Sequence, residues 1–362
     1  MKFKQCAAGT VGIEWELQVV DPQSRDLVSR APDLIKSIDD SRIQGEFFNS
    51  TVELISGIHP SVDSAMREMR ELRDIVMHEA DTQGLAIVGM GVHPFSHWQH
   101  QTLADSDRYR RVVDRVGEWG KRQIMIGVHT HFAVGDGDAA VAIQNRLLAE
   151  LPLILALSAS SPFRHGRDTG VASQRSMIFQ QLPNAGLPPL LDSWDAYTEL
   201  VRKMRRIDAI EEPGELRWAV RPAPVFGTIE ARIADGAPSL VDLAAVNALT
   251  VLSIERIARE LREGDVGPMT PDWLLRENRW RAIRYGLDAE IAFASGATRP
   301  VVELLHEAIR DLAPLADELG AKDSLEQVGT VLRRGNSAQR QRAVDRIGSV
   351  AVVDHLVADF RS

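Results

Sequence analysis

Apolar and polar residues alternate in several short segments of the first two thirds of the chain, which is the pattern of half-buried β-strands. The clearest segment is residues 10–20, TVGIEWELQVV, which is rich in β-branched and aromatic residues and ends at the turn pair Asp21-Pro22. Segments 216–221 and 227–233 lie so close together that they predict a hairpin. Six strands are predicted in total, centred on Ile13, Leu54, Ile87, Val128, Trp218 and Ile229.

Helical periodicity, with apolar residues three and four positions apart, occurs between and after these strands. Ser61 begins a helix that runs to about Gly84, and Ser239 begins another that ends near Gly264. From there to Ser362 the pattern is helical, and no further strand is predicted.

The order of these elements predicts the fold class. Strands do not alternate regularly with helices, so the rhythm of a parallel doubly wound sheet is missing. We therefore predict one α+β domain over residues 1–362, with a mainly antiparallel six-stranded sheet from residues 10–233 and a helical region at 239–362. No linker rich in Pro, Gly or Ser divides the chain.

The composition is that of a soluble, enzyme-sized protein, with 44% hydrophobic and 26% charged residues. The net charge of -9 argues against a nucleic-acid-binding surface. The single cysteine, Cys6, excludes an intramolecular disulfide and fits a reducing compartment. The N-terminus lacks the apolar core of a signal peptide and no segment is long enough to span a membrane, so we expect a cytoplasmic protein with no membrane partner. The sequence leaves open whether the chain forms homo-oligomers.

Two glutamates on the first predicted strand are the first sign of a functional site. Glu14 and Glu16 are two positions apart, so their side chains point to the same face of the sheet, while Trp15 points to the other. One interpretation is a solvated face with exposed charges. The other is a platform for a divalent cation, because Mg²⁺ prefers carboxylate oxygens as ligands. This strand alone does not decide between them.

Other predicted strands carry polar residues at the same spacing. His129 and His131 share one face of their strand, Glu230 and Arg232 share one face of theirs, and Glu53 lies on a third strand. One shared metal-lined face explains these residues more economically than several unrelated solvated faces, although a cross-strand ion-pair face remains the alternative for Glu230 and Arg232. Carboxylates, an imidazole and arginines together suit Mg²⁺ bound to phosphate oxygens.

At this point the chain resembles a known family along nearly its whole length. The matching blocks are, in order, TVGIEWEL, STVELISG, GVHTH, LSASSPFRHGRDTG, RWAVRPAP with GTIEARI, and RENRWRAIRYGLDAE. They resemble the type 2 glutamate–cysteine ligases, which are carboxylate–amine ligases of the glutamine-synthetase-like superfamily. The resemblance implies an antiparallel sheet cupped by helices, with ATP and Mg²⁺, or Mn²⁺, on its concave face.

The resemblance also implies roles for individual residues. Arg232 and Arg175 would be catalytic, with Arg232 clamping a phosphate or carboxylate group. Arg175 and Arg221 match basic positions of the substrate and nucleotide pocket, and His131 is the candidate to contact ATP. The implied metal ligands are Glu14, Glu16, Glu53, His129 and Glu230.

The chain departs from the usual family residues at a few positions, namely Thr130, Phe132-Ala133, Arg164 and Val171. We expect these positions to lie beside the substrate pocket. They would then affect the choice of amino acid rather than the ATP chemistry.

The implied reaction is ATP-dependent amide formation. A substrate carboxylate, the γ-carboxylate of glutamate, takes the γ-phosphoryl group of ATP, and an amine such as that of cysteine attacks the acyl phosphate. This chemistry needs positioning and charge stabilisation but no nucleophilic side chain, so Cys6 has no predicted catalytic role. Two alternatives stay open, a phosphotransferase on the same scaffold and a non-catalytic nucleotide-binding regulator.

Overall fold

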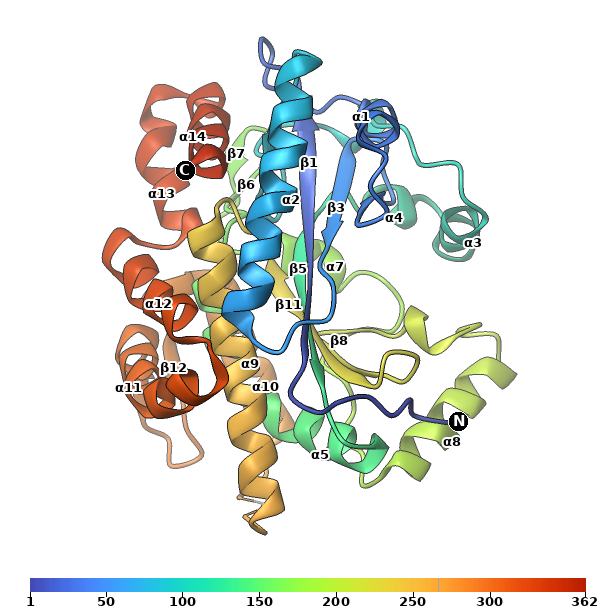
Figure 1. Cartoon of the computed structure of the whole chain (residues 1–362), viewed down its shortest axis with the longest axis vertical. Helices are drawn as coiled ribbons and strands as arrows, with labels where there is room; N and C mark the ends of the chain where they lie inside the picture. Colours follow the sequence, from blue (N-terminus) through green and yellow to red (C-terminus); the bar gives the residue numbers. More distant parts are fainter. Residues whose placement is uncertain (266) are drawn as a thin grey trace.

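A computed structural model describes residues 1–265 and 267–362, and a single large β-sheet lies at its centre (Figure 1). The strands in this sheet are β1 (Val11–Val20), β2 (Ile43–Gly45), β3 (Thr51–Ile55), β4 (Ala86–Val88), β5 (Gly127–Ala133), β10 (Val220–Ala223) and β11 (Thr228–Asp235). They follow the order β10-β11-β5-β1-β3-β2, and β4 pairs with the end of β1. All of these pairs are antiparallel, which confirms the predicted sheet type.

The strand prediction is wrong in two places between residues 43 and 223. The short strand β2 was missed, because its segment is polar and only Ile43 is buried. The predicted strand at 216–221 is two strands, since Ala219 donates its backbone N–H to Gly186 but accepts from Arg232. Its first part, β9 (Arg217–Trp218), pairs in parallel with β8 (Ala185–Gly186), and its second part is β10.

Short hairpins also lie outside the central sheet. The region predicted to be entirely helical contains the hairpin of β12 (Glu290–Ala292) and β13 (Thr298–Pro300). A second hairpin pairs β6 (Phe163–Arg164) with β7 (Arg167–Asp168). These strands are two or three residues long, too short for an alternation pattern to reveal them.

Helices cover the sheet and make up most of the C-terminal third, as predicted. Ser61 and Ser239 each accept a hydrogen bond from a backbone N–H of the first helical turn, so both predicted helix starts are correct. The helices are α1 (Ala31–Ile38), α2 (Val62–Thr82), α3 (Asp107–Val116), α4 (Glu118–Lys121), α5 (Gly137–Leu147), α6 (Leu151–Ser158), α7 (Gln174–Phe179), α8 (Trp194–Arg206), α9 (Leu240–Arg262), α10 (Asp272–Tyr285), α11 (Val301–Leu319), α12 (Lys322–Arg334), α13 (Ser337–Val344) and α14 (Ser349–Arg361).

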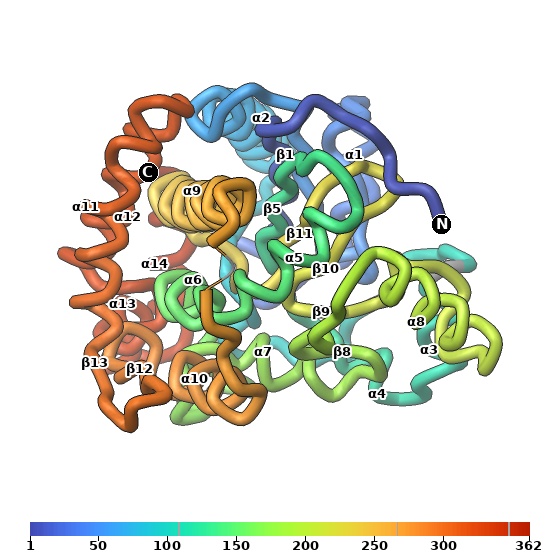
Figure 2. Tube along the Cα trace, turned by 90° about the horizontal axis from the view of Figure 1, so that it is seen from below, coloured from blue at the N-terminus to red at the C-terminus, as the bar shows by residue number. Residues whose placement is uncertain are grey.

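The main hydrophobic core lies between one face of the sheet and the long helices α2 and α9 (Figures 1 and 2). Ile13, Trp15 and Leu17 of β1 point into it and are fully buried. The Trp15 ring lies 5.6 Å from the ring of Phe360 in α14, and its Nε1 donates to the carbonyl of Ala237 at 3.0 Å. Since side chains alternate along β1, the residues between these three point to the opposite face of the sheet.

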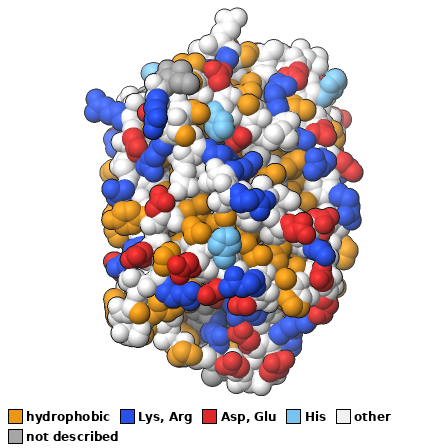
Figure 3. Space-filling view, turned by 90° about the vertical axis from the view of Figure 1, so that its left-hand side faces the viewer, with side chains coloured by type: hydrophobic (Ala, Val, Ile, Leu, Met, Phe, Trp, Pro, Cys, Tyr) orange, Lys and Arg blue, Asp and Glu red, His pale blue; other side chains and the backbone are white. Residues whose placement is uncertain are grey.

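The outer C-terminal helices α11 to α14 form a further layer beyond α9 (Figure 2). On this side of the molecule acidic and basic side chains are interspersed with hydrophobic ones (Figure 3). Among the described residues, no single helix is long and apolar enough to cross a bilayer, and only α5 and α6 meet that length and composition together, as a pair bent by 67°.

Candidate active site

The register of the central sheet places acidic and imidazole side chains next to one another. Glu14 of β1 lies opposite His129 of β5, and Glu16 of β1 lies opposite Glu53 of β3. Residues paired in this way point to the same face of a sheet. Since Trp15 points into the core, these four side chains lie on the face away from α2 and α9.

The strands on the other side of β5 add to the same face. Glu230 of β11 pairs with His131 of β5 and with Arg221 of β10. Arg232 follows two residues later, and its guanidinium contacts the carboxylate of Glu230. The group formed by these side chains is called the polar face below and consists of Glu14, Glu16, Glu53, His129, His131, Arg221, Glu230 and Arg232.

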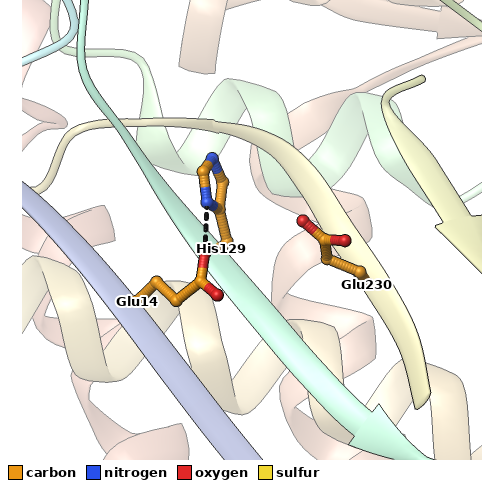
Figure 4. A group of neighbouring side chains, drawn as sticks. All are labelled: Glu14, His129 and Glu230. Carbon is orange, nitrogen blue, oxygen red and sulfur yellow. Dashed lines mark hydrogen bonds and ion pairs between the residues drawn. The ribbon is translucent and has the colours of Figure 1, made fainter. Parts of the chain in front are cut away.

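Two sets of three side chains on the polar face could each hold a metal ion. In the first set, ligand atoms of Glu14, His129 and Glu230 lie within 4.8 Å of one another, and the three side chains come from β1, β5 and β11 (Figure 4). In the second set, Glu16, Glu53 and His129 meet the same limit. Because His129 belongs to both sets, the sets adjoin. The structure therefore brings together the five side chains that the family resemblance named.

Two histidines contact the Glu14 carboxylate of the first set from both sides. His129 Nδ1 lies 2.7 Å from one carboxylate oxygen of Glu14, and His131 Nε2 lies 3.2 Å from the other. The remaining nitrogen of His131, Nδ1, is hydrogen-bonded to the hydroxyl of Thr228 at 2.9 Å. His131 therefore lies at the outer edge of the first set and orients Glu14.

Two arginines hold Glu230. Arg221 donates from Nε to Glu230 at 2.7 Å and from Nη1 to the carbonyl of Leu216 at 2.8 Å, while Arg232 contacts the other Glu230 oxygen. Arg232 Nη1 also lies 3.4 Å from His129 Nδ1. The protein itself thus engages much of the Arg221 guanidinium, whereas Arg232 faces the metal-compatible sets.

Arg175 reaches the polar face from α7. Its side chain is buried, its Nη1 donates to the carbonyl of Arg232 at 3.3 Å, and its Nε has no hydrogen-bond partner in the described part of the chain. A Cβ atom at Gly127 would lie only 2.3 Å from Arg175 Nη2, so this glycine makes room for the guanidinium. No acidic side chain among the described residues lies within ion-pair distance of Arg175, although the charges of Asp235 and Glu16 act on it, and its free Nε–H can donate to a bound anion.

Burial and crowding raise the pKa of two glutamates in the second set. Burial is the largest cause at both Glu16 and Glu53. Repulsion from Glu46 adds to it at Glu16, and repulsion from Glu14 and Glu16 adds to it at Glu53. The pKa of Glu16 rises to about 7, and that of Glu53 rises well above its ordinary value. A cation placed between them would relieve this repulsion.

In the first set, neighbouring side chains lower the pKa values of the glutamates. Burial raises the pKa of Glu14, but the hydrogen bonds with His129 and His131 outweigh it and hold that pKa well below its usual range. Burial likewise disfavours the ionised form of Glu230, but the charge of Arg232 outweighs it and lowers the pKa. Burial, aided by Arg232, lowers the pKa of His129 to about 4, so its imidazole is neutral and able to act as a ligand.

Two cavities border the polar face, one at the end near Glu16 and one at the end near Glu14. The first, called the Arg175 cavity, has a volume of about 160 Å³, and the residues lining it include Glu16, Glu46, Tyr109, Arg175, Phe179 and Arg232. The second, called the Phe226 cavity, has a volume of about 410 Å³, and its lining is mainly apolar with Glu14 and His131 at one side. Its apolar residues include Ile55, Ile58 and Phe226.

The positions at which the chain departs from the family pattern do not line either cavity, contrary to expectation. Thr130 donates to Asn247 of α9 at 2.7 Å and Phe132 is buried in the core, so both lie on the helix-covered face. Arg164 belongs to the separate β6–β7 hairpin, and Val171 lies in the loop before α7. The alternation along β5 could have excluded Thr130 and Phe132, because it places them opposite the histidines.

Three cavity residues were not predicted from the sequence. Glu46 follows β2 and Tyr109 lies on α3, so neither is part of a recognisable strand pattern. Phe226 lies in the turn between β10 and β11 and is 57% exposed. The sequence could have indicated Phe226 as a site residue, because it is an aromatic residue in the turn directly before the GTIEARI block.

Comparison with known proteins agrees with the family resemblance. Residues 10–349 match the model of the glutamate–cysteine ligase family 2. A relative from Clavibacter sepedonicus, which carries the provisional name glutamate–cysteine ligase 2, is 41% identical over 369 residues, covering 99% of this chain and 96% of its own. A relative from Nocardioides, with the provisional name glutamate–cysteine ligase 2-3, is 40% identical over 362 residues, covering 98% and 96% of the two chains.

Solved structures of ligases share the fold. The glutamate–cysteine ligase of Francisella tularensis in complex with AMP aligns with a TM-score of 0.67 at 15% identity, covering 100% of this chain and 90% of that one. The bifunctional glutathione synthetase of Pasteurella multocida aligns with a TM-score of 0.68 at 17% identity, covering 97% of this chain and 52% of that one. At these identities the likeness concerns the fold, and it confirms the predicted antiparallel sheet cupped by helices.

Proposed function

This chain belongs to glutamate–cysteine ligase family 2, and we propose that it joins the γ-carboxylate of glutamate to the amine of an acceptor such as cysteine, with ATP as the phosphoryl donor. The observation that carries the proposal is the polar face, where two adjoining sets of carboxylates share one imidazole. Arg175, which is buried and has no ion pair within the described part of the chain, lies at one end of this face, and a mainly apolar cavity lies at the other.

The ligand atoms of both sets suit Mg²⁺ or Mn²⁺, which prefer carboxylate oxygens and accept an imidazole. We propose that Glu14, His129 and Glu230 hold one cation and that Glu16 and Glu53 hold a second. When bound, the cations neutralise charge on the phosphoryl oxygens. Arg221 was expected to contact the nucleotide, but its contacts with Glu230 favour a role in fixing that ligand.

The nucleotide fits the Phe226 cavity. Its apolar lining can hold a nucleobase, and the Phe226 ring packs edge-on against His131, with the ring centres 5.5 Å apart. His131 and Glu14 both line this cavity and lie 3.2 Å apart, so His131 can contact the phosphate chain beside the first metal-compatible set. The triphosphate would then extend across the polar face toward the Arg175 cavity.

The carboxylate substrate fits the Arg175 cavity. Arg175 and Arg232 both line it and can donate hydrogen bonds to carboxylate and phosphoryl oxygens. In the proposed reaction, a carboxylate oxygen attacks the γ-phosphorus of ATP, and the phosphorus–oxygen bond to ADP breaks. The amine nitrogen then attacks the acyl carbon, and the carbon–oxygen bond to phosphate breaks.

Release of ADP across a panel of amino acids, with mass spectrometry of the products, tests this proposal. A ligase requires both a carboxylate and an amine substrate and forms ADP, phosphate and an amide. A phosphorylated acceptor with no amine requirement would instead identify a phosphotransferase. ATP binding without ADP release under any combination would identify a nucleotide-binding regulator and refute the proposal.

A further inference from the structure

Another arginine lines a cavity that is separate from the polar face. This cavity has a volume of about 360 Å³ and lies between α10 and the segment that follows α7. The two helices pack against each other (Figure 2). The cavity is called the Arg279 cavity below, and its lining includes Gln180, Gly186, Leu187, Arg276, Arg279 and Trp280. None of these residues belongs to the polar face or lines the Arg175 cavity or the Phe226 cavity.

No carboxylate among the described residues pairs with the guanidinium of Arg279. This side chain is half-buried, its Nη1 donates to Oε1 of Gln180 at 3.2 Å, and its Nε is buried with no hydrogen-bond partner in the described part of the chain. The two acidic residues of α10, Asp272 and Glu277, pair with other arginines of that helix, each at 2.7 Å. Burial, aided by the charge of Arg276, lowers the pKa of Arg279 to about 10. The guanidinium is therefore still cationic at neutral pH, and an anion would stabilise it.

The lining of the cavity defines the class of anion that fits. Arg276 already pairs with Asp272, so Arg279 supplies one uncompensated positive charge. A carboxylate carries one negative charge and accepts two hydrogen bonds from a guanidinium, whereas a phosphate dianion would leave an excess charge in the cavity. The indole of Trp280, which is 42% exposed, and the side chain of Leu187 provide apolar surface beside the guanidinium. The cavity therefore suits a monocarboxylate with a small apolar body.

Gln180 connects this cavity with Arg175. It directly follows α7, and its Oε1 is the acceptor that a bound carboxylate would replace on Nη1 of Arg279. The preceding residue, Phe179, is the last of α7, and the centre of its ring lies 5.5 Å from the guanidinium carbon of Arg175. Phe179 lines the Arg175 cavity, whereas Gln180 lines the Arg279 cavity. The C-terminal end of α7 is thus in contact with both cavities.

We propose that the Arg279 cavity is a second ligand site, which binds a small monocarboxylate through Arg279, and that its occupation loosens the C-terminal end of α7. The carboxylate oxygens accept from the guanidinium in place of Gln180, and the apolar body lies against Trp280. The hydrogen bond from α10 to the end of α7 is then lost. Because Phe179 and Arg175 line the cavity assigned to the carboxylate substrate, the site would be regulatory, and this last step alone rests on the proposed function.

Isothermal titration calorimetry with benzoate tests the site. We expect wild type to bind benzoate but not benzamide, its uncharged analogue, and Arg279→Gln to lower the affinity for benzoate by about 10-fold or more. Arg279→Lys keeps the charge but loses the planar fork, so its affinity should be intermediate. Arg310→Gln, which removes the same charge from an exposed position of α11, should bind benzoate as wild type does. Arg175→Gln should also bind it unchanged, because the substrate cavity is not involved.

Hydrogen–deuterium exchange tests the effect on α7. Benzoate should increase amide exchange over residues 176–181 in wild type and leave it unchanged in Arg279→Gln. Unchanged exchange in wild type with benzoate bound would overturn the link to α7. Neither measurement needs ligase activity, so a failure of this site and a failure of the proposed function are distinguished.

Four results would overturn the site itself. The first two are an unchanged affinity in Arg279→Gln and an absence of binding by wild type at millimolar benzoate. The third is tighter binding of inorganic phosphate than of benzoate, which would exclude a carboxylate site, and the same loss of affinity in Arg175→Gln would place benzoate in the substrate cavity instead. The fourth is a dimer that Arg279→Gln dissociates, which would show that a second copy of the chain fills the cavity.

Discussion

Replacing Glu16 with Gln should stabilise the metal-free protein above neutral pH, even though it removes a proposed metal ligand. Gln keeps the shape of the side chain and can still accept the hydrogen bond from the backbone N–H of Gly127. It removes a carboxylate that burial and the nearby Glu46 make difficult to ionise. Stability and activity should therefore change in opposite directions.

The size of the effect follows from the pKa. Burial raises the pKa of Glu16 from 4.5 to about 7 in the folded protein. Because one pKa unit is worth about 1.4 kcal/mol, this rise corresponds to about 3 kcal/mol. Because Glu16 holds its proton more tightly in the folded protein than in the unfolded chain, protonated Glu16 favours folding. This contribution to the free energy of unfolding is fully present below about pH 4.5 and is lost as the pH rises through about 7.

Chemical unfolding in the presence of a chelator measures this directly. The free energy of unfolding of wild type and Glu16→Gln should differ little near pH 5, and near pH 8 the variant should be more stable by up to about 3 kcal/mol. Glu71→Gln, with the same loss of charge on the exposed side of α2, serves as the control and should show no such dependence. Saturating Mg²⁺ should then stabilise wild type near pH 8 more than it stabilises Glu16→Gln.

Two results would refute the reasoning. If the difference between wild type and Glu16→Gln does not depend on pH, Glu16 does not titrate with a raised pKa in the folded protein. If Mg²⁺ stabilises both proteins equally, Glu16 is not a ligand, and the second metal position has to be abandoned.

Further predictions concern single residues. Glu14→Gln should lower Mg²⁺-dependent ADP release by about 100-fold or more in protein that still folds, and chelator should abolish wild-type activity until Mg²⁺ or Mn²⁺ is added; retained turnover would exclude Glu14 as a ligand. Arg175→Gln should raise KM for the carboxylate substrate by about 10-fold to 100-fold, and an unchanged KM would place that substrate elsewhere. Cys6→Ser should keep near-normal turnover, because burial raises the pKa of the thiol, Sγ donates to the carbonyl of Gly227 and a serine hydroxyl can replace that hydrogen bond; a collapse in rate with the fold intact would contradict the mechanism. Trp15→Ala should lower the free energy of unfolding by about 3–5 kcal/mol in denaturant titration, and a loss below 1 kcal/mol would mean that the site collapses to fill the cavity.

The sequence was sufficient to predict which side chains share a face, because the period of a strand is two residues whatever its neighbours are. It therefore separated Glu14 and Glu16 from Trp15, and His129 from Thr130. It could not supply the register between strands, which pairs Glu14 with His129 and Glu16 with Glu53. Register depends on contacts between residues far apart in the chain, and here the family resemblance took the place of that information.

The errors in the strand prediction have the same origin. Nothing in residues 216–221 indicates that the backbone changes partner at Ala219, because the change depends on Gly186 and Arg232 from distant segments. Glu46 was missed for a related reason, since its place in the Arg175 cavity depends on Tyr109 of α3. The single-domain organisation and the cytoplasmic location remain predictions.

The two ends of the polar face balance their charge in different ways, and this difference bears on how the site works. The histidines provide hydrogen bonds to Glu14 and two arginines provide positive charge beside Glu230, so both carboxylates stay ionised without a bound cation. Around Glu16 and Glu53 no side chain among the described residues provides a matching ion pair apart from the 4.0 Å approach of His129 to Glu16, and both pKa values are raised. A cation therefore gains more by binding at the second set, where it relieves repulsion that the protein leaves uncompensated. That end also borders the Arg175 cavity, so the charge of the metal would be largest where the substrate carboxylate has to approach a phosphoryl group.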